Sequence, residues 1–191
     1  MDLAAKSAGR RPSAAHWLLV TSAMIRAAIS LAMRPGRDGM HALQCLVRVC
    51  FPSVPQISTA GLAAWLSDRQ RPRPLLLDIR EREEFDVSHL AGAIAILPNA
   101  RPEVVTILAG QNTPIVVYCS VGYRSSALAS KLIKAGFTNV KNLEGSIFQW
   151  ANEGRPIEAG GKAVKLVHPY HRLFRRLLME GVSGGTRRKN R

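Results

Sequence analysis

Cysteine is scarce in this sequence, with three among 191 residues: Cys45, Cys50 and Cys119. The number is odd and no two of them form a Cys-x-x-Cys pair, which argues against a disulfide framework. Cys45 and Cys50 lie near the N-terminus, so Cys119 has no resolving cysteine near it in the sequence. Any covalent chemistry at Cys119 would therefore use one thiol.

Long apolar runs are also missing. The run from Trp17 to Ile25 ends at Arg26 after nine residues, whereas a bilayer span needs about 20. Aromatic residues make up 6% of the chain, but hydrophobic residues in total make up 47%, which excludes a disordered chain and favours buried strands covered by helices. The length allows one domain of about 100 to 150 residues with flanking segments.

Acidic residues number 13 against 27 basic ones, a formal net charge of +14 that is unevenly distributed. Residues 1–56 hold seven basic and two acidic side chains, and residues 158–191 hold nine and two. No zinc-finger spacing or aromatic-interleaved basic motif accompanies them, so we expect no specific nucleic-acid partner. The basic arms are suited instead to an anionic membrane or a protein partner.

We expect three segments: a basic N-terminal arm over 1–52, a folded domain over 53–157 and a basic C-terminal extension over 158–191. The arm reads as a transit peptide, a secretory signal or an extension upstream of the true start, and these readings stay open. The expected compartment is the cytoplasm, or an organelle or the exterior if the arm is a targeting segment. In the extension we expect an amphipathic helix over 168–179, to pack on the domain, lie on a membrane or bind a partner, and a disordered tail.

The domain alternates between short apolar runs and helical patterns. This alternation predicts an α/β fold with a mainly parallel sheet and helices on both faces. The predicted strands are 54–57, 75–79, 93–97, 115–118 and 140–143, with helices in between and after the last. Cys119 follows the most apolar strand at its carboxyl end, where functional groups of such sheets lie.

The segment Cys119-Ser120-Val121-Gly122-Tyr123-Arg124-Ser125 joins that strand to a helix. If the loop wraps around Cys119, its backbone N–H groups and the positive end of the helix point inward and favour an anion. Gly122 permits the tight turn, and Arg124 adds a positive charge. Such a nest favours a nucleophilic thiolate at Cys119, and it would stabilise a persulfide anion on the same residue.

Three motifs resemble those of single-domain rhodaneses. The Cys119–Ser125 segment is similar to their CxxGxRS loop, and Leu77-Asp78-Ile79-Arg80-Glu81 with the segment 85–94 is similar to DVRE…F…GHIPGA. Residues 142–150 are similar to the L-x-GG-x-x-x-W element. The resemblance implies a rhodanese-like three-layer fold of five strands and a sulfurtransferase without metal or organic cofactor.

On this resemblance Cys119 is the persulfide cysteine, and the pocket consists of the loop residues Ser120, Val121, Gly122, Tyr123, Arg124 and Ser125. The implied partners are a small sulfur donor (thiosulfate, polysulfide or persulfide) and a thiol or cyanide acceptor, which includes protein thiols. The chain departs from the family pattern at Ser88, Ala91 and Ser146. Val121 and Tyr123 also make the loop less cationic, so we expect thiosulfate to be a poor donor.

Three alternative functions for a cysteine in such a loop make different demands on the sequence. A cysteine phosphatase places five residues between its Cys and Arg, whereas four separate Cys119 from Arg124. A papain-like protease needs a His base, and His89 is expected to be structural. A non-catalytic relay or regulatory module is the remaining alternative. Asp78 and Arg80 are possible supporting residues of the site, with a structural ion pair as the favoured role.

Overall fold

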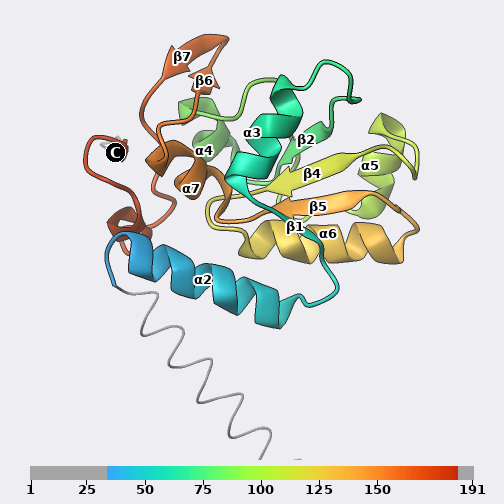
Figure 1. Ribbon diagram of the computed structural model, residues 1–191, viewed down its shortest axis with the longest axis horizontal. Helices are drawn as coiled ribbons and strands as arrows, with labels where there is room; N and C mark the ends of the chain where they lie inside the picture. The colour runs from blue at the N-terminus through green and yellow to red at the C-terminus, as the bar shows by residue number, and fades with distance from the viewer. Residues whose placement is uncertain (1–33, 185–191) are drawn as a thin grey trace, which may run out of the picture.

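Five parallel strands form the centre of the structure, a computed structural model that describes residues 34–184 (Figure 1). The strands lie in the order β1-β5-β4-β2-β3, and every neighbouring pair is parallel. They are β1 (Gln56–Ile57), β2 (Leu75–Asp78), β3 (Ile94–Ala95), β4 (Ile115–Tyr118) and β5 (Val140–Leu143). The predicted α/β class and five-stranded, mainly parallel sheet are therefore confirmed.

Helices cover both faces of this sheet (Figure 1). They are α3 (Thr59–Ser67), α4 (Arg82–Val87), α5 (Pro102–Leu108), α6 (Tyr123–Lys134) and α7 (Ser146–Asn152). Side chains of β4 alternate between two hydrophobic clusters, because successive residues of a strand point to opposite faces. Val116 and Tyr118 belong to the cluster that includes residues of α3 and α7, and Val117 to the cluster that includes residues of α5 and α6. Both faces of the sheet are thus buried, which explains the continuous apolar run.

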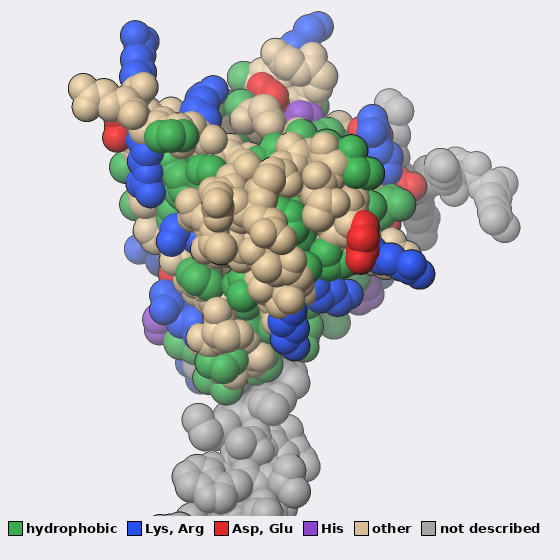
Figure 2. Space-filling view, turned by 90° about the vertical axis from the view of Figure 1, so that its right-hand side faces the viewer, with side chains coloured by type: hydrophobic (Ala, Val, Ile, Leu, Met, Phe, Trp, Pro, Cys, Tyr) green, Lys and Arg blue, Asp and Glu red, His purple; other side chains and the backbone are tan. Residues whose placement is uncertain are grey.

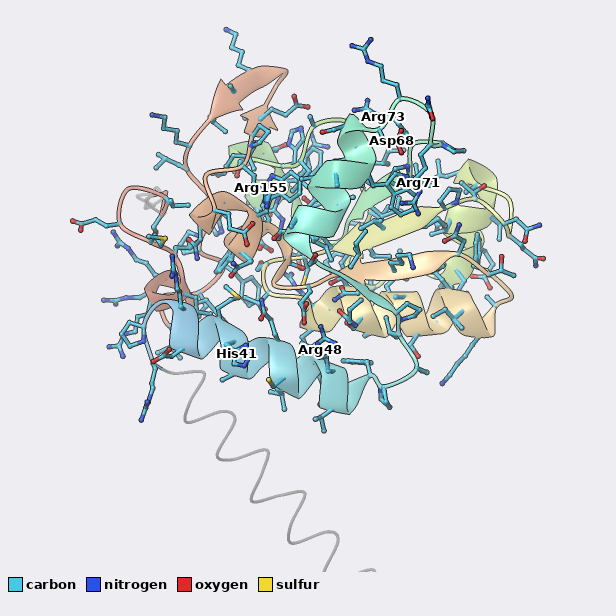
Figure 3. All side chains as sticks on the ribbon, in the orientation of Figure 1. His41, Arg48, Asp68, Arg71, Arg73 and Arg155 are labelled. Carbon is cyan, nitrogen blue, oxygen red and sulfur yellow. The ribbon has the colours of Figure 1, made fainter. Side chains whose placement is uncertain are left out.

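Helix α2 (Arg37–Cys50) lies within the predicted N-terminal arm, yet it packs on the domain. Met40 and Val47 are buried, and Met40 joins the cluster beneath α3 and α7. Arg48, labelled on α2 in Figure 3, donates from Nε to Oε1 of Glu144 at 2.6 Å, and this bond connects α2 to the turn after β5. Residues 34–50 are therefore not a free appendage. The rest of the predicted arm, with its targeting readings, lies outside the described residues.

The C-terminal extension corrects one prediction. In place of an amphipathic helix over 168–179, the structure has only one 3-10 turn, η1 (Phe174–Leu177). Pro169 cannot donate a helical hydrogen bond, and Tyr170 has a φ of 60°, so the chain bends sharply at this point. The segment packs on its own domain, because Leu177 and Leu178 are buried and Asn152 Nδ2 donates to the Leu177 carbonyl at 2.7 Å.

A two-stranded antiparallel hairpin precedes this turn and was not predicted. It consists of β6 (Ile157–Ala159) and β7 (Lys162–Val164). The backbone of Glu158 in β6 exchanges two hydrogen bonds with that of His89, at 2.8 and 2.9 Å. The hairpin therefore extends the folded unit beyond residue 157, and the predicted basic tail lies mostly outside the described residues.

Two observations concern the expected membrane and protein partners. Figure 2 shows the Lys and Arg side chains of one face spread around its edge rather than gathered in a single patch. Within residues 34–184, no helix combines the length and the apolar character that crossing a bilayer requires.

Candidate active site

The sulfur of Cys119 lies at the carboxyl end of β4, inside the loop that leads to α6. Cys119 is 1% exposed. The backbone N–H of Gly122 donates to its Sγ at 3.2 Å, and the Ser125 hydroxyl lies 3.5 Å from the same sulfur. Gly122 has a φ of 105° and directly precedes α6, so the helix starts from a left-handed residue. This geometry directs two hydrogen-bond donors at the sulfur, the arrangement that binds an anion.

Ser146, one of the departures from the family pattern, supports the loop from behind. Its hydroxyl accepts the Cys119 N–H at 3.1 Å and donates to the Leu143 carbonyl at 3.1 Å. The residue has a φ of 52°, in the region that favours glycine. The side chain thus adds two hydrogen bonds at a strained position, and it joins the start of the loop to the end of β5. The sequence marked Ser146 as a departure but did not reveal this contact.

Arg124 is paired with a carboxylate that the sequence did not single out. Its Nη2 lies 3.2 and 3.1 Å from the two carboxylate oxygens of Glu84 in α4, and 3.0 Å from the Ser120 hydroxyl. Glu84 is 2% exposed, and its Oε1 also accepts from Ser120 at 2.8 Å. Burial lowers the pKa of Arg124, but Cys119 and Glu84 outweigh this and leave that pKa above its ordinary value. The guanidinium therefore stays charged, and Glu84 compensates its charge.

A cavity of about 380 Å³ opens beside the Cys119 sulfur. It is lined by Leu43, Cys119, Ser120, Val121, Tyr123, Arg124, Tyr170 and Phe174. Of the predicted pocket residues, Ser120, Val121, Tyr123 and Arg124 face this cavity, whereas Gly122 and Ser125 contact the sulfur without lining it. Leu43, Tyr170 and Phe174 come from the flanking segments, and no loop motif could have indicated them.

Asp78 and Arg80 do not line this cavity. They form a pair with 2.6 Å between Arg80 Nη2 and Asp78 Oδ2, and both side chains are fully buried. Burial lowers the pKa of Arg80, while Asp78 opposes this and leaves that pKa raised. Arg80 Nη2 also donates to the Ser88 carbonyl. The two residues therefore connect β2 to the turn after α4, which is the structural role favoured from the sequence.

His89 does not face the sulfur either. Its Nδ1 lies 3.0 Å from the Phe85 carbonyl oxygen, its ring stacks on that of Phe85, and its Nε2 lies 3.7 Å from Oε1 of Glu158. These contacts fix the end of α4 against the hairpin.

Comparison with known proteins shows which family the chain resembles. The family model "Rhodanese-like domain" matches residues 62–153. Thiosulfate sulfurtransferase 16, a chloroplastic protein of Arabidopsis thaliana, is 36% identical over 94 residues, which are 44% of this chain and 78% of that protein. The chain belongs to the rhodanese-like domain family.

Other rhodanese-like relatives are more distant. The solution structure of the rhodanese-like domain of an Anabaena protein has a TM-score of 0.51 and 27% identity, over 55% of this chain and 79% of that one. The tRNA uridine(34) hydroxylase of Photorhabdus laumondii is 29% identical over 100 residues, but they are only 28% of its length. Relatives thus include sulfurtransferases and a protein with another named activity, so the family alone does not determine the reaction.

The donor at Gly122 gives a prediction that does not depend on any reaction of the protein. In Gly122→Ala, a Cβ would lie 3.3 Å from Nδ2 of Asn142 at a φ of 105°, and relief of this strain turns the N–H away from the sulfur. We expect the rate of Cys119 alkylation by iodoacetamide at pH 7 to fall about tenfold. The rate is measured from the change in mass of the peptide that contains Cys119. The variant should also lose about 1–2 kcal/mol of stability.

Gly154→Ala is the matched control. Gly154 also has a positive φ, of 69°, but no atom would lie within 4 Å of its added Cβ. It should show a comparable loss of stability with an unchanged alkylation rate. Equal alkylation rates in both variants would show that the Gly122 N–H does not activate the sulfur.

Proposed function

We propose that this rhodanese-like protein is a sulfurtransferase that carries a sulfur atom as a persulfide on Cys119. The observation that supports it most is the placement of the Cys119 sulfur, which borders a cavity while it accepts the Gly122 N–H at 3.2 Å. A thiolate in this position is nucleophilic, and the same donors stabilise the charge of a persulfide.

The reaction takes place in two displacements. The Cys119 thiolate attacks the outer sulfur of a sulfane donor; a new S–S bond forms at Cys119 and the donor's own bond to that sulfur breaks. The leaving group is sulfite from thiosulfate, or a thiolate from an organic persulfide. In the second step a thiolate or cyanide attacks the outer sulfur, and the Cys119 thiolate is regenerated as the leaving group.

The surroundings of Arg124 favour this reaction over phosphate hydrolysis. A phosphatase needs its loop arginine to bind the phosphate oxygens with several donors. Here Nη2 of Arg124 is occupied by Glu84 and Ser120, so part of the guanidinium is already committed. The shorter loop and the compensated charge fit a single sulfur better than a phosphate dianion.

The test is to find where sulfur is carried. The full-length protein is incubated with inorganic polysulfide or thiosulfate, freed of donor and weighed by intact mass spectrometry. We expect a gain of about 32 Da that a thiol reductant reverses. Cleavage after Lys and Arg places Cys45, Cys50 and Cys119 in three different peptides, and the added sulfur should lie on the peptide of Cys119. An unmodified Cys119 peptide after treatment with both donors would refute the proposal.

A further inference from the structure

The outer wall of the cavity is made by segments that lie outside the matched family region, residues 62–153. Leu43 comes from α2, Phe174 from η1, and Tyr170 from the segment just before η1. All three are apolar or aromatic. Val121 and Tyr123 extend the same character from the loop, so a substrate at Cys119 would be surrounded mainly by hydrocarbon.

This wall is fixed to the domain. The backbone N–H of Gly36, just before α2, donates to the Arg176 carbonyl at 2.9 Å and so joins the two flanking segments. Asn152 of α7 binds both sides of the η1 end, with its Nδ2 on the Leu177 carbonyl and its Oδ1 accepting the Met179 N–H at 2.9 Å. Leu177 is 2% exposed. Phe174, the first residue of η1, is therefore held at the cavity, and the half-exposed Tyr170 ring lies against it with 5.8 Å between the ring centres.

The cavity also offers little net positive charge. Among the described residues that line the cavity, only Arg124 has a side chain of the Lys, Arg, Asp or Glu type. Glu84 compensates it, and its guanidinium carbon lies 4.4 Å from the centre of the Tyr170 ring. A dianion such as thiosulfate would exchange its water for an apolar wall without gaining a free cation, which is unfavourable. An apolar group would instead gain free energy by leaving water.

From these contacts we infer the substrate class of the site, an inference that rests on the proposed sulfur transfer. Cys119 takes its sulfur from small organic persulfides with an apolar body, and Leu43, Tyr170 and Phe174 determine this specificity. The cavity of about 380 Å³ lies at the small end of the range for ligand sites. The apolar body lies against the flanking wall while the outer sulfur meets the Cys119 thiolate.

The transfer balances without any further reactant. The Cys119 thiolate forms a bond to the outer sulfur of R–S–SH, and the S–S bond of the donor breaks. The proton stays on the transferred sulfur, and the organic part leaves as the thiolate R–S⁻. The loop donors then stabilise the Cys119 persulfide when it loses that proton.

The test compares two donors that share the reacting group and differ in the body. Benzyl persulfide is apolar, and mercaptosuccinate persulfide carries two carboxylates. Single-turnover loading of the full-length protein is followed by intact mass. We expect benzyl persulfide to load Cys119 at least about tenfold faster, and Phe174→Ala to lower the ratio of the two rate constants about tenfold. Leu43→Ala is a second variant, in the other flanking segment, and it should also lower the ratio of the two rate constants.

Leu173→Ala is the matched control, since Leu173 precedes Phe174 but is 49% exposed and does not line the cavity. Its ratio should equal that of the parent protein. Equal rates for the two donors in the parent protein, or an unchanged ratio in both wall variants, would overturn the inference while loading by polysulfide leaves the proposed function intact. Absence of loading by every donor would overturn both. A thermal melt identifies any variant that fails to fold, and Phe174→Leu then replaces Phe174→Ala.

Discussion

Replacing Cys119 with serine should abolish sulfur loading and reduce transfer to cyanide by at least about 10³-fold. A serine hydroxyl is un-ionised at neutral pH and forms no persulfide, so neither displacement can occur. Because the oxygen is smaller than the sulfur and can accept from the Gly122 N–H as the sulfur does, the fold should be retained. The measurement is thiocyanate release per protein after loading with polysulfide.

Cys45→Ser and Cys50→Ser are the matched controls for this variant. Both cysteines are exposed and lie in or at the end of α2. Each variant should release thiocyanate at the parent rate. Release by Cys119→Ser at more than a few per cent of the parent rate would show that another residue carries the sulfur.

Replacing Asp78 with asparagine should lower the free energy of unfolding by about 3–5 kcal/mol, the largest effect on stability that we expect. The change leaves the Arg80 guanidinium buried without its carboxylate, although the Ser88 carbonyl still accepts from it. The side chains are nearly equal in size, so the loss would come from the uncompensated charge. Equilibrium unfolding in urea, monitored by tryptophan fluorescence, measures it.

An exposed ion pair nearby provides the comparison. Arg82 and Asp86 of α4 are 2.8 Å apart and largely exposed. Asp86→Asn should cost less than about 0.5 kcal/mol, because water screens the pair and replaces it when it is broken. Similar losses for the two variants would mean that the Asp78–Arg80 pair contributes no more than a surface pair.

The sheet could be predicted from the sequence because its central strands are buried on both faces. The predicted ranges of β4 and β5 agree with the structure at both ends. Helix α6 follows β4 as predicted, and it begins at Tyr123 because left-handed Gly122 allows the helix to start directly after it. Local sequence patterns thus predict most of the strands and helices of the domain.

The flanking segments could not be predicted in this way. Leu173, Phe174, Leu177 and Leu178 suggested a helical spacing, but Leu177 and Leu178 are buried against the domain while Leu173 is exposed. Their burial depends on contacts with α2 and α7, which are distant in sequence. A pattern along one segment contains no information about such partners.

Residues of the candidate site could likewise be predicted where they are close in the chain, and not where they are distant in it. Cys119, Gly122 and Arg124 lie close together in the chain, so a sequence motif can identify them. Glu84 is 40 residues away from Arg124, and its position beneath the loop follows from how α4 packs. Its only local signal is a capping box with Glu81, which indicates a helix start and no contact with the loop.

The hydrogen bond between Gly36 and Arg176 has a practical consequence for any study of this protein. The bond joins the two flanking segments that contribute Leu43, Tyr170 and Phe174 to the cavity, so a fragment cut to the family boundaries would keep the thiol and lose these three residues. If these residues select the donor as we propose, we expect such a fragment to discriminate less between apolar and anionic donors than the intact chain does. Donor preferences measured on the trimmed and the whole chain would then differ.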